Sequence, residues 1–333
     1  MADGPSTLPG QTVTPVRPVS DAPLVDAPFA ATITDLGQER PDLVVLSADL
    51  SKYTDVAPFA EKFPSRFFQV GMAEQNMMGI AGGLAKTGCL PVAVTYAVFA
   101  TRRACDQLQM ALATGPRTAV VAAFLPGITT PFRASHQGTD DLAIARGIPG
   151  MTVIDPMDAT ELSAALRAAV DQPGPVYLRG LRGQVPEILS PPLDFTVGAT
   201  RLLRDGGDIA FIGTGLGSRW ALEAAGRLAE QHIQAAVLHA PTVKPFDAAG
   251  VARFAAEFPA VITVENHSMV GGLGSAVAEA VADRGVRGRV WRRGVPDRWA
   301  EAGPLDFIRA ALGLDAAALA ATAIDAINAR EGR

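Results

Sequence analysis

Cysteine, histidine and long apolar runs are all scarce in this sequence. Cys89, Cys105 and four histidines stand among 333 residues. So few thiols exclude a disulfide framework and favour reduced cysteines in a cytoplasmic protein. Because the histidines are scattered, we expect no metal ligand in this chain. No run approaches the ~20 apolar residues that cross a bilayer, so no membrane partner is expected.

Clustered basic charge is also missing. Lys and Arg number 29 against 34 Asp and Glu, which gives a net charge of −5. Nucleic acid is bound mainly through grouped cations on its phosphates, so we expect no nucleic-acid partner. Residues 1–20 carry neither the basic region nor the apolar stretch of a secretory signal, which again favours the cytoplasm.

The chain shows a regular alternation of short apolar runs and helix-length segments. Residues 1–23 lack this pattern and are predicted to be a mobile arm. Apolar strands separated by helices indicate parallel sheets covered on both faces. We therefore predict an α/β protein with two consecutive three-layer αβα domains and mainly parallel sheets, over residues 24–185 and 197–333. The Pro-rich residues 186–196 are the predicted linker.

One Gly-rich stretch raises the hypothesis of a dinucleotide-binding site. Residues 213–217 (GTGLG) lie between an expected strand and an expected helix. The dinucleotide fingerprint requires a further Gly at position 218 or 220, and these hold Ser218 and Trp220. The stretch is therefore interpreted as a tight strand-to-helix turn.

A carboxylate stands at an unusual place in the segment 71–84 (GMAEQNMMGIAGGL). Glu74 opens an expected helix that is otherwise almost wholly apolar. A Glu in the first turn is often favoured simply by the helix dipole. This helix has no solvated polar face, however, so we expect the carboxylate to be enclosed. Enclosed carboxylates are costly and are frequently functional.

The segment 71–76 (GMAEQN) resembles the pyrimidine-domain motif of transketolases, especially the two-gene (split) kind. It is less closely similar to deoxyxylulose phosphate synthase and to the β subunits of 2-oxoacid dehydrogenase E1. The resemblance extends over residues 25–330 and is carried by further motifs in order: 47–52 (SADLSK), 95–99 (TYAVF), 135–137 (SHQ), 148–153 (IPGMTV), 264–268 (VENHS), 271–275 (GGLGS) and 294–298 (GVPDR).

The resemblance implies thiamine diphosphate chemistry. Glu74 matches the carboxyl group that hydrogen-bonds N1′ of the aminopyrimidine and favours the imino tautomer, which removes the thiazolium C2 proton. Tyr96 and Phe99 match the aromatics that pack on the pyrimidine, and His136 matches the histidine that handles protons of the substrate. Asp49 and Leu50, in the loop before the motif, are the remaining cofactor-binding residues that the resemblance implies.

The family's diphosphate and Mg²⁺ motif, Gly-Asp-Gly followed by an Asn, has no counterpart here. No Gly-Asp-Gly occurs in the sequence. The resemblance therefore implies a partner, the N-terminal (diphosphate-binding) subunit, which would hold most of the metal and diphosphate in an α₂β₂ assembly. The apolar surface of the pyrimidine domain is also expected to pair with a second copy of this chain.

The substrate half departs from the family pattern. Arg182 matches one phosphate-binding Arg of the family. Where the family has another Arg, a Ser and a His, this sequence has Asp26 or a neighbour, Tyr53, and Leu125 or Phe124. Phe132 and Arg133 lie in the segment that replaces a Gly-Glu-Asp-Gly stretch. Such a pocket does not suit a phosphorylated polyol. Arg102, Arg103 and Arg133 are the nearby cations that could replace the missing phosphate ligands.

The leading interpretation is the β-type subunit of a two-component, transketolase-like transferase. It would transfer a two-carbon ketol or acyl-anion unit to an aldehyde-type acceptor other than a standard sugar phosphate. One alternative is an E1 β subunit that decarboxylates a 2-oxo acid. The other is a non-catalytic subunit that only stabilises its partner. Together, Glu74, Tyr96 and His136 argue against the last of these.

Overall fold

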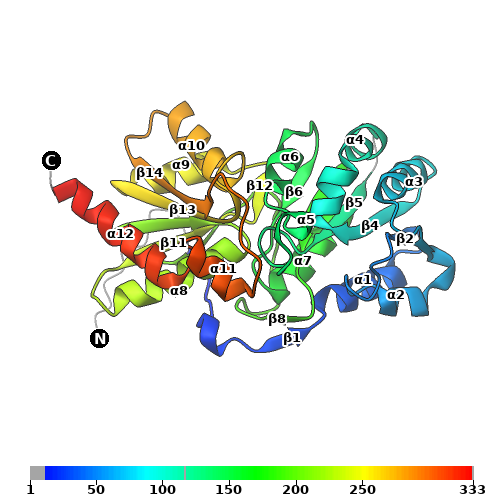
Figure 1. Cartoon of the computed structure of the whole chain (residues 1–333), viewed down its shortest axis with the longest axis horizontal. Coiled ribbons are helices and arrows are strands. Elements are labelled where there is room, and N and C mark those ends of the chain that lie inside the picture. The colour runs from blue at the N-terminus through cyan, green and yellow to red at the C-terminus, as the bar shows by residue number, and fades with distance from the viewer. Residues whose placement is uncertain (1–11, 116–117, 332–333) are drawn as a thin grey trace.

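Two αβα domains lie side by side (Figure 1). The computed structural model describes residues 12–115 and 118–331. In Figure 1 the first domain, mainly cyan to green, occupies one half of the view and the second, yellow to red, the other. The expected fold class, two three-layer αβα domains with mostly parallel sheets, is confirmed.

A seven-stranded sheet, counted over the described residues, forms the centre of the first domain. Its strand order is β12-β6-β7-β5-β4-β2-β3, and only the β12–β6 pair is antiparallel. Its central strands are buried throughout because helices cover both faces. The strands are β2 (Leu43–Ser47), β3 (Phe67–Gln69), β4 (Leu90–Tyr96), β5 (Ala119–Phe124), β6 (Thr152–Ile154), β7 (Pro175–Gly180) and β12 (Thr242–Lys244).

Each face of this sheet has its own set of helices. On one face pack α1 (Pro28–Glu39), α2 (Ala57–Lys62) and α7 (Ala159–Val170). On the other pack α3 (Glu74–Lys86), α6 (Asp141–Gly147) and the helical segment over residues 99–113. That segment is α4 (Cys105–Gln107) between two π-helical stretches, Phe99–Arg103 and Leu108–Ala113. The short helix α5 (Arg133–His136) lies in the loop after β5.

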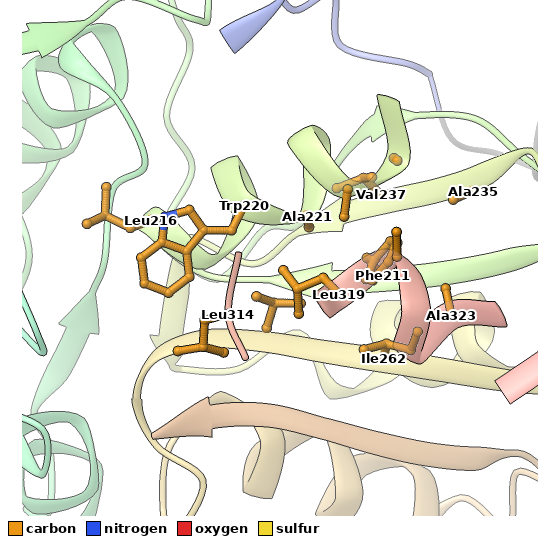
Figure 2. Packing of buried hydrophobic residues seen from close by; sticks show 14 of the residues in the cluster. Phe211, Leu216, Trp220, Ala221, Ala235, Val237, Ile262, Leu314, Leu319 and Ala323 are labelled. Atoms are coloured by element: carbon orange, nitrogen blue, oxygen red, sulfur yellow. The ribbon is translucent and has the colours of Figure 1, made fainter. Parts of the chain in front are cut away.

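The second domain is built on a five-stranded sheet in the described part of the chain. The order is β14-β13-β10-β11-β9, with only β9 antiparallel to its neighbour. One face is covered by α8 and α12 and the other by α9 and α10, and Figure 2 shows the first of these cores. The elements are β9 (Arg201–Arg204), β10 (Ile209–Gly213), α8 (Leu216–Ala229), β11 (Ala235–His239), α9 (Ala248–Ala256), β13 (Ala260–Ser268), α10 (Leu273–Asp283), β14 (Arg289–Val295), α11 (Leu305–Ala311) and α12 (Ala316–Glu331).

The predicted mobile arm needs correction over its second half. Residues 1–11 lie outside the described residues. Residues 12–23 pack along the second domain, where the Thr14 amide donates to the Leu202 carbonyl at 2.8 Å and Val16 and Val19 contact the core. Val13 also pairs with Leu202 on the edge strand β9, and such contacts with distant residues are not revealed by local composition.

The predicted linker, residues 186–196, is also partly built into the structure. Strand β8 (Gln184–Pro186) pairs antiparallel with β1 (Leu24–Asp26). Beyond it Ile188 and Leu189 are fully buried, and both of their amides donate to Asp158 Oδ2. The connection between the domains is therefore fixed rather than a free hinge.

The C-terminal stretch corrects the statement that no apolar run is long enough to span a bilayer. Leu305–Ala329 has the length and, with a mean hydropathy of 1.6, the composition of such a span. In the structure it is broken into α11 and α12, which place Ile308, Leu319 and Ala323 in the core of the second domain. The absence of a membrane partner stays a prediction.

Candidate active site

A cavity of about 930 Å³ opens at the carboxyl edge of the first sheet. It is formed by the loops that follow β2, β4, β5 and β7 together with the first turn of α3. Ligands of open parallel sheets commonly bind at this edge. Nine of the ten residues predicted from the sequence line the cavity: Asp49, Leu50, Tyr53, Glu74, Tyr96, Phe99, Phe132, His136 and Arg182.

Glu74 is the buried acid of this cavity. It opens helix α3, as predicted, and is only 1% exposed, so the expected enclosure of its carboxylate is confirmed. Its two oxygens accept hydrogen bonds from Arg103 Nη1 at 3.1 and 2.9 Å. The Arg103 side chain is half-exposed and lies against the Phe99 ring. The carboxylate therefore has a charged partner that can leave toward solvent.

Aromatic rings form the wall beside Glu74. Tyr96 and Phe99 stack with their centroids 5.8 Å apart and an angle of 21° between their planes. The His136 ring meets Phe99 edge-on at 5.5 Å and lies tilted against Phe132 at 5.1 Å. Burial raises the pKa of Tyr96, so its hydroxyl stays protonated. The wall is thus flat, largely apolar and bordered by one imidazole.

The loop that carries His136 is held in place by the second domain. Asn266 accepts from the Ile128 amide and donates to the Pro126 carbonyl, both at 2.9 Å. Gln137, only 1% exposed, donates to the Glu301 carbonyl at 3.1 Å. Ser135 Oγ lies 2.9 Å from His136 Nδ1, whereas Nε2 makes no hydrogen bond to the described residues. Nε2 is therefore free to meet a ligand.

The strand ends supply the remaining lining residues. Asp49 has a φ of 61°, in the left-handed region, and its amide donates to Gln69 Oε1 at 2.6 Å. Non-glycine residues in this conformation are often found at functional sites. Arg182, two residues beyond β7, lies over the Tyr53 ring at 6.0 Å.

Arg133 is the predicted site residue that the structure does not bring to the cavity. It opens the short helix α5, and its half-exposed side chain lies 3.9 Å from Glu301. Arg102 is likewise engaged elsewhere, with Asp140 at 2.8 Å. Of the three cations considered as replacement phosphate ligands, Arg103 lines the cavity, but it is paired with Glu74.

Sequence reasoning missed some of the lining. Met72, Thr129, Thr130 and Ser135 face the cavity without having been singled out. Met72 directly precedes the Ala-Glu of the recognised motif and is 77% exposed. A large apolar residue in a turn was the available signal. Thr and Ser in a loop carry no comparable signal.

A buried polar network joins the two domains. The fully buried Arg179 bridges Asp141 and Asp155, and Asp141 also faces His267 of the second domain. Burial lowers the pKa of His267 to about 4, so this imidazole is neutral. Burial raises the pKa of Glu265 to about 7, although its oxygens accept from the Leu273 and Gly274 amides.

The fold and the site together define a class: a two-domain αβα protein with a buried acid, an aromatic wall and a histidine loop at the carboxyl edge of its first sheet. Two family models match it, the transketolase pyrimidine-binding domain over residues 25–187 and the transketolase C-terminal domain over residues 198–319. The chain belongs to the transketolase family.

Relatives extend this finding. The chain is 44% identical to a transketolase family protein of Sinorhizobium fredii, over 89% of this chain and 86% of that one. It is 39% identical to the 6-deoxy-6-sulfo-D-fructose transketolase subunit SqwH of a Clostridium species, over 86% and 89%. It also resembles 1-deoxy-D-xylulose-5-phosphate synthase 1 of Geobacter sulfurreducens, at 39% identity over 91% of this chain but 48% of that protein.

A solved structure supports the same assignment. The structure titled "Split gene transketolase, inactive beta4 tetramer" superposes with a TM-score of 0.83 at 38% identity, over 90% of this chain and 97% of that one. This chain is accordingly a split-transketolase-like subunit, and members of its family depend on thiamine diphosphate.

The residues present fit one end of that cofactor. A flat aromatic wall beside a buried carboxylate suits a planar heterocycle that hydrogen-bonds through a ring nitrogen. The described residues hold no group of three or more His, Cys, Asp or Glu that could bind a metal. The lining of the cavity is thus suited to the aminopyrimidine end of the cofactor.

Proposed function

We propose that this chain is the pyrimidine-side subunit of a two-component, thiamine-diphosphate-dependent transferase that moves a two-carbon ketol or acyl-anion unit to an aldehyde-type acceptor. The observation that carries the proposal is the placement of Glu74, Tyr96, Phe99 and His136 around one cavity. When bound, the cofactor supplies the electron sink for cleaving the bond beside a substrate carbonyl.

Each of these residues has a separate task in the proposal. Glu74, once released from Arg103, holds a proton in a hydrogen bond to N1′ of the pyrimidine. Tyr96 and Phe99 contact the ring and exclude water from it. His136, through Nε2, gives or takes a proton at the carbonyl or hydroxyl oxygen of the substrate. A subunit that only stabilises its partner would need neither the buried Glu74 carboxylate nor the aromatic wall beside it.

A partner subunit is the second part of the proposal. Three large apolar side chains at the mouth of the cavity are exposed: Tyr53 by 56%, Phe132 by 61% and Met72 by 77%. We call these three the cavity rim. Exposed apolar residues around a functional cleft mark interaction surfaces. The sequence also lacks the Gly-Asp-Gly motif. We therefore propose an N-terminal subunit that holds Mg²⁺ and diphosphate, an α₂β₂ assembly through pairing of two copies of this chain, and a cytoplasmic location.

The proposed acceptor or donor differs from a standard sugar phosphate. In the cavity the cations are Arg103, which pairs with Glu74, and Arg182. A phosphate dianion is usually held by several charge-assisted hydrogen bonds. One relative is named for a sulfo sugar rather than a sugar phosphate, which is consistent with a varied substrate half in this family.

Calorimetry tests whether the cofactor site is shared between this chain and the proposed partner subunit. Thiamine diphosphate with Mg²⁺ is titrated into the purified chain alone and into the chain co-purified with its diphosphate-binding subunit. We expect negligible binding to the chain alone and tight, Mg²⁺-dependent binding to the complex. Tight binding to the isolated chain would refute the shared site.

A further inference from the structure

A second cavity, of about 380 Å³, lies between the two domains. It is lined by the segment after β7, by the first two turns of α8 and by α11. It shares Leu125, Thr129 and Arg182 with the larger cavity, so the two adjoin. Its volume is within the range of small-molecule sites.

Three arginines line this second cavity, and their charges are only partly balanced. Arg309 donates to Glu223 at 2.6 Å and lies over the Trp220 ring at 4.9 Å. The carboxylate nearest along α8 is thereby used by Arg309 and not by Arg219. With Glu223 and Asp306 as the two lining carboxylates, the cavity has one positive charge in excess.

Arg219 is the cation left over. Within the described residues its side chain makes no hydrogen bond, and no carboxylate oxygen lies within 4.0 Å of it. Its Nε is buried without a partner, as is the Nε of Arg309. Arg182 has no carboxylate partner in the described chain either. Buried guanidinium donors are almost always satisfied, and one that is not needs an explanation.

Arg219 is held in a fixed position by the helix that carries it. Leu216, Arg219, Trp220 and Glu223 share one face of α8 because they are spaced by three and four residues. Figure 2 shows Leu216 and Trp220 at one end of the second domain's core. Trp220 is buried, so the helix face that presents Arg219 is fixed. The guanidinium is therefore held at the cavity by a rigid element.

We propose that this interdomain cavity binds a small oxyanion, a phosphate, sulfonate or carboxylate group, with Arg219 as its principal ligand and Arg309 and Arg182 beside it. Guanidinium groups recognise such anions through charge-assisted, often bidentate, hydrogen bonds. The anion is either the distal end of a substrate that extends from the larger cavity or a free ion. The binding site itself does not depend on the proposed catalytic function.

Thermal unfolding of the full chain tests the site. Sodium phosphate is added at constant ionic strength to the wild type, to Arg219→Gln and to Arg227→Gln. Arg227 is an exposed arginine on the same helix and is the matched control. We expect phosphate to raise the Tm of the wild type and of Arg227→Gln. Arg219→Gln should bind phosphate at least about 10-fold more weakly by calorimetry, as expected for one lost charge-assisted bond.

A second readout separates an anion site from a structural role. A partly buried cation without a partner, with its Nε donor buried and unsatisfied, is costly, so Arg219→Gln without phosphate should unfold at the same or a higher temperature than the wild type. A lower Tm, or failure of this variant to fold, would mean that Arg219 supports the structure, and would overturn the proposal. No phosphate effect on the wild type, or an equal effect on Arg219→Gln, would overturn it as well.

The source of the anion is decided by a longer probe. Fructose 6-phosphate is titrated into the wild type and into His136→Ala, whose altered residue lines the larger cavity. If a substrate spans both cavities, the sugar phosphate binds more tightly than inorganic phosphate, and His136→Ala weakens it. If the anion is free, the two probes bind alike and His136→Ala changes neither. Both results support the site and distinguish its ligands.

Discussion

Glu74→Gln is the substitution that most directly tests the site. The amide keeps the shape of the side chain but cannot hold and return a proton at the pyrimidine. We expect turnover of the complex with its partner subunit to fall by at least ~10²-fold, or about 2.7 kcal/mol of transition-state stabilisation. Cofactor binding should weaken much less, because the hydrogen-bonding group remains.

The same substitution should leave stability almost unchanged. The Arg103 side chain that faces Glu74 is 47% exposed, and ion pairs with such exposed members contribute about 0–1 kcal/mol. Removal of a buried carboxylate's charge also relieves a desolvation cost. We therefore expect the free energy of unfolding to change by no more than about 1 kcal/mol. An ordinary helix-start Glu would give a similarly small loss in stability, about 0.3–1 kcal/mol, but normal turnover, so the turnover is what separates the two roles.

The assay combines steady-state ketol transfer by the reconstituted complex with urea unfolding of the same preparations. Glu61→Gln, which removes an exposed carboxylate on α2, is the matched control and should be neutral in both. If Glu74→Gln retains near-normal turnover, Glu74 has no catalytic role and the assignment of the cavity is wrong.

Three further predictions follow from the same contacts. Arg103→Gln leaves the Glu74 carboxylate buried without its partner, so the Tm of the variant without cofactor should fall. Thiamine diphosphate should then raise the Tm of the variant complex by more than it raises that of the wild-type complex. An equal rise would show that Arg103 need not move when the cofactor binds. Phe132→Asp, in the cavity rim, should raise activity toward hydroxylated aldehydes. The wild-type complex should use xylulose 5-phosphate with ribose 5-phosphate poorly, and efficient turnover of that pair would mean that its substrates are those of ordinary transketolases. Burial raises the pKa of Glu265 from 4.5 to about 7, so its stabilising effect is complete below pH 4.5 and is lost as the pH rises through 7. The stability of the wild type relative to Glu265→Gln should fall by about 3 kcal/mol over that range, and parallel pH profiles in urea unfolding would contradict this.

The sequence predicted the elements whose signal is local. Helix α3 begins at Glu74 as expected, because the apolar pattern starts directly after this residue. The buried strands were found for the same reason, since parallel strands covered on both faces are apolar throughout. Motifs then placed nine site residues in order along these elements, and the carboxyl ends of parallel strands brought them together.

What the sequence could not predict depends on contacts between distant segments. Strand β12 follows the second domain's third strand in the chain, yet it pairs with β6 in the first sheet. The Arg103–Glu74 pair joins residues 29 positions apart, and the pairing of Arg309 with Glu223 leaves Arg219 without a partner. Arg133 was assigned to the substrate because it lies in the segment that replaces the family's Gly-Glu-Asp-Gly stretch. Its helix instead directs it toward Glu301, a residue of the other domain.

The larger cavity is well packed at its floor but open to solvent at its mouth, and this difference bears on how the proposed activity would be controlled. Its floor is complete: Glu74 is 1% exposed, and the His136 loop is held by Asn266 and Gln137 through hydrogen bonds to both domains. Its mouth is not, because the cavity rim leaves large apolar side chains in water. In the part of the chain that the structure describes, the helices that pack on the two sheets are committed to those sheets and do not cover the rim. The proposed partner subunit would supply the missing wall, and an activity that depends on water exclusion would then begin only when that subunit binds.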